Sequence, residues 1–133
     1  MLIRTVINFV TFASLASAAF SPHQKPAFAC AMNKLTADQR TALSSAMHRL
    51  IDAKPATKEL ANGYEMRFDH AGELYSAATT WIENERVCCP FFSFNVALSQ
   101  NDGPMTIRLT GPKGVKEFID GDLPALKQMT HGG

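Results

Sequence analysis

The stretch from Trp81 to Phe92 constrains the fold more than any other, because it joins an apolar helix to paired cysteines and a proline. Apolar side chains before it recur on one arc of a helical wheel at ~100° per residue. That arc contains Leu74, Ala77, Ala78, Trp81 and Ile82, and Glu85, Cys88 and Cys89 continue it. Glu85 thus occupies a position that the pattern reserves for an apolar residue. Pro90 cannot continue a helix, so a helix over about 73–89 is predicted.

Two further helices are predicted, one before and one after this central helix. Thr36 and Gln39 have the residue types and spacing of a capping box. Apolar residues then repeat at helical spacing as far as Pro55, which predicts a helix over about 37–53. The last helix is short, and its apolar face contains Val115, Phe118 and Ile119.

Four strands are predicted from short runs in which apolar and polar residues alternate. The first two, at about 57–61 and 64–69, flank Asn62-Gly63, which is typical of a type I′ hairpin turn. The other two cover about 92–99 and 105–110. The predicted fold class is therefore α+β: a four-stranded, mainly antiparallel sheet of two hairpins, with about three helices packed on one face.

The N-terminal residues have the features of a removable secretory signal over 1–18. Arg4 supplies a positive charge, a mostly apolar run follows, and Ala16-Ser17-Ala18 offers a cleavage site. The run is shorter than the ~20 residues of a membrane-spanning helix, so no membrane span is expected. A true signal implies a periplasmic or secreted protein, whereas without one the protein would be cytoplasmic.

The remaining chain divides into an arm, a domain and a tail. Two prolines and the lack of periodicity indicate a linker or extended arm over 19–29. A single α+β domain is predicted over 30–125, and a flexible tail over 126–133. The net charge of +1 shows no basic excess, so no nucleic-acid partner is expected.

Three cysteines are too few for a disulfide framework, and their number is odd. A bond between Cys88 and Cys89 is disfavoured, because neighbouring Cα atoms lie ~3.8 Å apart and disulfides span ~4.4–6.8 Å. Cys30 is the only other disulfide partner in the chain. If all three are reduced, they form a set of thiol ligands that prefers soft metal ions.

Glu85 needs either a partner or a proton, because an unpaired buried carboxylate is costly. Arg67 and Arg108 are the expected candidates for pairing with it. The thiols would also need an arginine or a metal to become reactive, since the negative end of the helix dipole raises a thiol pKa. The simpler alternative is that Cys88 and Cys89 are packing residues and that Glu85 forms a buried ion pair.

The chain resembles a family of small, largely uncharacterised bacterial proteins with a Glu-Arg-x-Cys-Cys-Pro-Phe motif. The matching segments are Glu85 to Phe94, Ile107 to Pro112, Val115 to Phe118, Ala29-Cys30, Leu35-Thr36, Gly63-Tyr64 and Arg67-Phe68. The resemblance covers roughly residues 28–120. Some members are encoded beside mercury-resistance genes or fused to regulators of the mercury-responsive type, which implies a role in soft-metal biology.

The leading hypothesis is a thiol-based domain that binds or senses a soft metal such as mercury or arsenic. Its candidate ligands are Cys30, Cys88 and Cys89, with Glu85 as an orienting acid. The expected partner is a soft metal ion or a small thiol-reactive species. Two alternatives stay open: a thiol-dependent enzyme, catalysing redox exchange or organometal cleavage with Glu85 as proton donor, and a structural or partner-binding module whose cysteines only pack.

Overall fold

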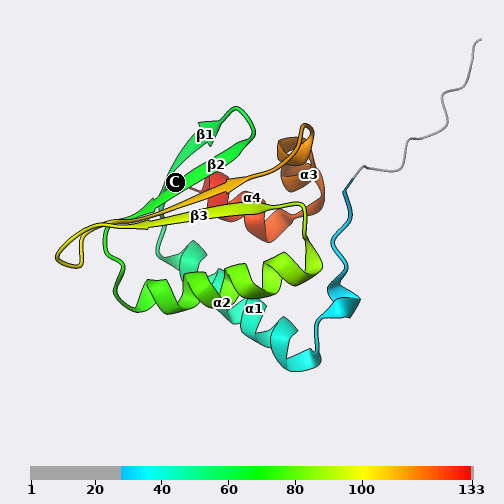
Figure 1. Cartoon of the computed structure of the whole chain (residues 1–133), viewed down its shortest axis with the longest axis horizontal. Coiled ribbons are helices and arrows are strands. Elements are labelled where there is room, and N and C mark those ends of the chain that lie inside the picture. Colours follow the sequence, from blue (N-terminus) through cyan, green and yellow to red (C-terminus); the bar gives the residue numbers. More distant parts are fainter. Residues whose placement is uncertain (1–27, 133) are drawn as a thin grey trace, which may run out of the picture.

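The computed structural model describes residues 28–132, in which two hairpins alternate with helices (Figure 1). The elements are η1 (Met32–Lys34), α1 (Ala37–Asp52), β1 (Ala56–Leu60), β2 (Gly63–Phe68), α2 (Gly72–Cys88), β3 (Ser93–Leu98), β4 (Met105–Thr110), α3 (Val115–Asp122) and α4 (Pro124–His131). The α+β class is confirmed. The predicted signal over 1–18, and all of the 19–29 arm except its last two residues, lie outside the described residues.

The four strands form one antiparallel sheet in the order β1-β2-β4-β3. Each hairpin pairs its own strands, and the second strands of the two hairpins then pair with each other, with Met66 opposite Ile107. This arrangement confirms the predicted four-stranded antiparallel sheet. Within the described residues there are four α-helices and one 3₁₀ turn, rather than the three helices that the sequence predicts.

Burial alternates along the two central strands, so one face of the sheet carries the core. The buried positions are Tyr64, Met66 and Phe68 of β2 and Met105, Ile107 and Leu109 of β4. The ring of Trp81 in α2 packs edge-on at 5.2 Å from that of Phe94 in β3. On the same face, Tyr64 of β2 lies across Leu109 from Phe94, and its ring is 5.0 Å from the His131 ring of α4. Helices α2 and α4 therefore cover the same face (Figure 1).

Local signals explain where α1 and α2 begin and end. The predicted capping box is present, since Gln39 N–H donates to Thr36 Oγ1 and Thr36 N–H donates to Gln39 Oε1. Helix α2 begins at Gly72, whose N–H donates to the Asp102 carboxylate in the β3–β4 loop at 2.9 Å. It ends at Cys88, two residues before Pro90, as predicted to within a residue.

The β1–β2 turn differs from the prediction, whereas the β3–β4 loop lies between the predicted third and fourth strands. The β1–β2 turn consists of Ala61 and Asn62, because Gly63 is already paired with Leu60 in the sheet. Gly63 instead allows β2 and β4 to pack closely, because a Cβ atom at this position would lie 1.9 Å from the Leu109 carbonyl oxygen. The positive φ angles of a type I′ turn occur instead at Asn101 and Asp102, in the β3–β4 loop.

The predicted flexible tail over 126–133 does not hold for residues 126–131, which belong to α4. Pro124 stands in the first turn of that helix, where its missing N–H costs nothing. Leu126 and Met129 are each 1% exposed and pack into the core, which explains why this segment is ordered. No helix in the described part of the chain is long and apolar enough to cross a membrane.

Candidate functional site

Helix α2 carries Glu85 and Cys88 to the edge of the core and then stops. Glu85 and Cys88 lie one turn apart on the buried arc, as the sequence predicts. Cys89 N–H makes the last bond of the helix, to the Glu85 carbonyl oxygen at 2.7 Å. The backbone of Cys89 then leaves the helical conformation, at φ −125° and ψ 70°. The two neighbouring cysteine side chains therefore start from different backbone geometries.

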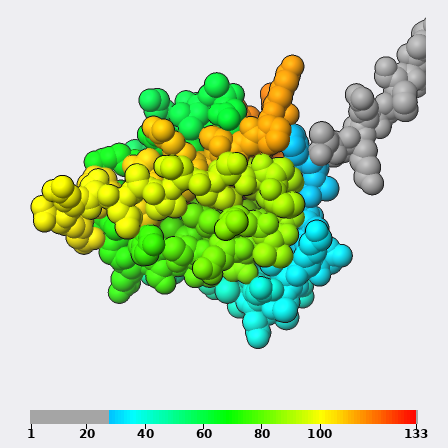
Figure 2. Space-filling view, in the orientation of Figure 1, coloured from blue at the N-terminus to red at the C-terminus, as the bar shows by residue number. Residues whose placement is uncertain are grey.

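The described segment before η1, residues 28–31, brings Cys30 to the same place, and we call this segment the N-terminal arm. Ala31 N–H donates to the Cys88 carbonyl oxygen at 2.7 Å, and this bond satisfies a carbonyl that the end of α2 leaves free. The Phe28 ring packs 4.8 Å from the Phe91 ring and 5.9 Å from the Phe118 ring. In Figure 2 the start of the described chain, coloured blue, lies against the body of the molecule.

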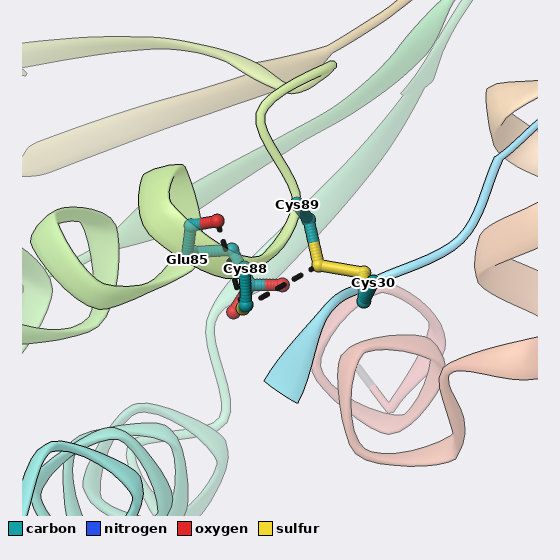
Figure 3. Close-up of a disulfide and its surroundings, with 4 residues drawn as sticks. All are labelled: Cys30, Glu85, Cys88 and Cys89. Atoms are coloured by element: carbon teal, nitrogen blue, oxygen red, sulfur yellow. Dashed lines mark hydrogen bonds between the residues drawn. A yellow bond between two sulfur atoms is a disulfide. The ribbon is translucent and has the colours of Figure 1, made fainter. Parts of the chain in front are cut away.

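Cys30 and Cys89 form a disulfide across a separation of 59 residues (Figure 3). Their Cα atoms lie 4.6 Å apart, within the range that disulfides span. Of the pairings that the sequence allows, Cys30 with Cys89 is thus the one formed, and Cys88 is left as the free thiol. Phe28 and Ala31, which hold the arm in place, were not identified from the sequence; the aromatic side chain of Phe28 is the only signal for such an anchor.

Cys88 is buried beside this disulfide. Its Sγ atom lies 3.6 Å from Cys89 Sγ and 3.6 Å from the Glu85 carbonyl oxygen. The residue is 1% exposed. Burial, assisted by the nearby Glu85 carboxylate, raises the pKa of the Cys88 thiol to about 11. Cys88 is therefore a neutral thiol at physiological pH.

Glu85 is also buried and faces the disulfide. It is 5% exposed, and one ligand atom from each of Cys30, Glu85 and Cys89 lies within 4.8 Å of the others. Burial raises the pKa of the Glu85 carboxyl from 4.5 to about 7, although the nearby Trp81 indole acts to lower it. Trp81 Nε1 nevertheless has no hydrogen-bond partner of ordinary geometry in the described structure, so desolvation dominates.

The structure does not bring Arg67 or Arg108 to Glu85. Arg67 pairs with Asp69 at 3.2 Å, and Arg108 pairs across the sheet with Glu65 at 2.6 Å. Both arginines project from the sheet face opposite the core, because they alternate with buried residues of β2 and β4. Among the described residues, no basic side chain forms an ion pair with Glu85. Because the buried carboxyl group has no ion-pair partner there, it holds its proton more tightly, as its raised pKa indicates.

We call Cys30, Glu85, Cys88 and Cys89 the cysteine cluster. It combines a disulfide, a buried neutral thiol and a carboxyl group that changes charge near neutral pH. Such a set permits two kinds of chemistry: thiol–disulfide exchange and, once the disulfide is reduced, ligation of a soft metal ion. Comparisons with models of protein families, with curated proteins and with solved structures find no match.

Proposed function

We propose that this protein binds a soft metal ion through Cys30, Cys88 and Cys89 when these residues are reduced. The observation that carries the proposal is the convergence of three sulfur atoms from two distant segments, at Cys30 and at Cys88-Cys89. Cys30 and Cys89 lie close enough to be bonded, and Cys88 Sγ lies 3.6 Å from Cys89 Sγ. Reduction of the disulfide leaves three thiols at one end of α2, next to the carboxyl group of Glu85.

The chemistry of this donor set favours soft ions. Thiolates select mercury, arsenic and similar species over calcium or magnesium, which prefer oxygen ligands. Burial raises the thiol pKa of Cys88, but metal binding displaces the proton and favours the thiolate. Glu85 lies within 4.8 Å of Cys30 and Cys89, so it can orient these ligands or accept their protons.

The disulfide and the metal compete for the same sulfur atoms. While Cys30 and Cys89 are bonded to each other, neither can supply a thiolate to an ion. Only the reduced protein is therefore expected to bind metal. Metal binding would therefore depend both on the redox state of the cysteine cluster and on the presence of the ion.

A thiol-dependent enzyme has one observation in its favour, the approach of the free Cys88 thiol to the disulfide. Exchange requires a thiolate, however, and the pKa of Cys88 is about 11. Its attack on Cys89 would also create a bond between neighbouring cysteines, which is geometrically disfavoured. A role in packing alone fits the burial of Cys88 and Cys89, but it gives no reason for a carboxyl group at Glu85. Metal binding, by contrast, gives a role to all four residues of the cysteine cluster.

The test is a titration of the reduced protein with Hg(II), in which free thiols are counted after each addition. We expect one ion per chain and loss of the thiols of Cys30, Cys88 and Cys89 together. Removing a residue that hydrogen-bonds to a metal ligand weakens metal binding by ~10–100-fold. Cys30→Ser and Cys89→Ser each remove a ligand itself, so each should weaken Hg(II) binding by more than that. The oxidised wild-type protein is the control and should bind weakly. Unchanged affinity in both serine variants would refute the proposal.

A further inference from the structure

The two cysteines of the disulfide differ in their exposure to solvent. Cys89 is 1% exposed and lies under the end of α2, beside the equally buried Cys88. Cys30 is only partly buried, and it lies on the arm before η1 (Figure 3). A reagent from solution is therefore expected to reach Cys30 before Cys89.

The arm is held on both sides of Cys30 by contacts that do not involve its sulfur atom. Before it, the Phe28 ring packs on Phe91 and Phe118. After it, Ala31 N–H donates to the Cys88 carbonyl oxygen, and Leu35 is buried at 3% exposure. We therefore expect Cys30 to keep its position in the folded structure when the disulfide opens.

We propose that Cys30 is a site of S-thiolation, at which a small monothiol such as glutathione opens the Cys30–Cys89 disulfide. The monothiol reacts as a thiolate, and its electron pair forms a new sulfur–sulfur bond to Cys30 Sγ. The Cys30–Cys89 bond breaks, and its electron pair stays on Cys89 Sγ, which takes up the proton that the monothiol lost. The monothiol sulfur is oxidised, Cys89 is reduced, and atoms and electrons balance.

The burial of Cys89 directs the attack to Cys30. A thiolate approaches a disulfide along the line of the sulfur–sulfur bond, from the side opposite the leaving sulfur atom. Attack on Cys30 uses the partly exposed side, whereas attack on Cys89 would require a thiolate to enter where Cys88 Sγ lies 3.6 Å away. Glu85, 5% exposed and without an ion pair in the described structure, also faces this buried side. The reaction places two free thiols, Cys88 and Cys89, inside the molecule.

S-thiolation at Cys30 would be the first step from the oxidised form to the metal-binding form. This role rests on the proposed function. A second monothiol then removes the adduct and frees Cys30. The reaction itself involves no metal. It can therefore be tested whether or not the cluster binds an ion.

The experiment treats the folded, oxidised protein with glutathione and stops the reaction with acid. Free thiols are then alkylated, and the adduct is located by peptide mass spectrometry. We expect glutathione on the peptide that contains Cys30, and alkylation of Cys89 only after unfolding. An adduct on Cys89 would overturn the proposal.

Two variants give a second, kinetic test. Cys89→Ser retains Cys30, and Cys30→Ser retains Cys89, so each is treated with oxidised glutathione to measure adduct formation. Because reactivity follows exposure, Cys30 should react at least about tenfold faster than Cys89. Near-ultraviolet circular dichroism checks that both variants are folded. Equal rates in two folded variants would contradict the proposal, and the adduct map of the wild-type protein decides the matter if either variant does not fold. No metal enters either test, so failure here is distinct from failure of Hg(II) binding.

Discussion

Cys88 Sγ lies 3.6 Å from Cys89 Sγ, yet only Cys89 is bonded to Cys30. The difference arises at the end of α2. Cys88 is the last helical residue and follows the apolar arc into the core, whereas Cys89 has left the helical conformation. One backbone step thus separates a buried free thiol from a sulfur atom that ties down the N-terminal arm.

Cys88 should be unreactive in the folded protein. Its burial raises the thiol pKa to about 11, so the thiolate is scarce below that pH and alkylating reagents cannot reach it. We expect iodoacetamide at pH 8 to modify Cys88 only after denaturant is added. The measurement is the mass of the oxidised protein over time. Rapid modification under native conditions would show that the end of α2 opens readily.

The Cys30–Cys89 disulfide should contribute about 4 kcal/mol to the free energy of unfolding, because it closes a loop between residues 59 positions apart. Urea unfolding of the wild-type protein with and without dithiothreitol measures this contribution. Cys30→Ser should lose a similar amount and should no longer respond to the reductant. A loss below ~1 kcal/mol would indicate that the arm is held mainly by Phe28 and Ala31.

Glu85 should make the folded protein less stable as the pH rises. The folded-state pKa of about 7 exceeds the ordinary value of 4.5, so the folded protein holds this proton more tightly than the unfolded chain. The contribution of Glu85 is therefore most favourable below pH 4.5, falls between pH 4.5 and 7, and levels off above pH 7. The total loss is on the order of 3 kcal/mol.

Glu85→Gln should abolish this loss, and the exposed Glu83→Gln is the matched control. Urea unfolding at pH values from about 4 to 8 gives the difference between the wild-type protein and each variant. For Glu85→Gln, the variant should gain stability relative to the wild type as the pH rises. A difference that stays constant with pH would contradict the raised pKa.

Gly63 should tolerate no side chain, because a Cβ atom would lie 1.9 Å from the Leu109 carbonyl oxygen. Gly63→Ala is expected to cost at least about 2 kcal/mol of unfolding free energy, since β2 and β4 must separate. Gly121→Ala is the control: it lies inside α3, where a Cβ atom meets nothing within 4 Å. That variant should gain about 0.5–1 kcal/mol. Urea unfolding compares the two, and equal effects would show that β2 and β4 are less closely packed.

Local patterns predict much of this fold. Thr36 with Gln39 and Pro90 mark helix ends correctly, and alternation marks the strands, because both depend on nearest neighbours in the chain. The turn residues were mistaken because Asn62-Gly63 has the residue types of a type I′ turn, whereas Gly63 is required by a distant contact with β4. Helix α4 was missed because its apolar face is only a few residues long.

The candidate site is less predictable, because its geometry depends on contacts far apart in the sequence. The helical-wheel pattern of the sequence correctly indicates that Glu85 and Cys88 are buried. The choice of Cys89 over Cys88 as the disulfide partner depends on the backbone at the helix end, which residue types do not specify. Arg67 could have been set aside from the sequence alone. It alternates with Met66 and Phe68, so it projects away from the core and from Glu85.

The most direct test of the proposed site is the arsenic K-edge absorption spectrum of the reduced protein with one equivalent of As(III). Trivalent arsenic forms three bonds, so we expect a shell of sulfur alone, from Cys30, Cys88 and Cys89. Cys88→Ser should replace one sulfur neighbour with oxygen. A wild-type spectrum dominated by oxygen neighbours, or one that Cys88→Ser leaves unchanged, would contradict a three-cysteine site.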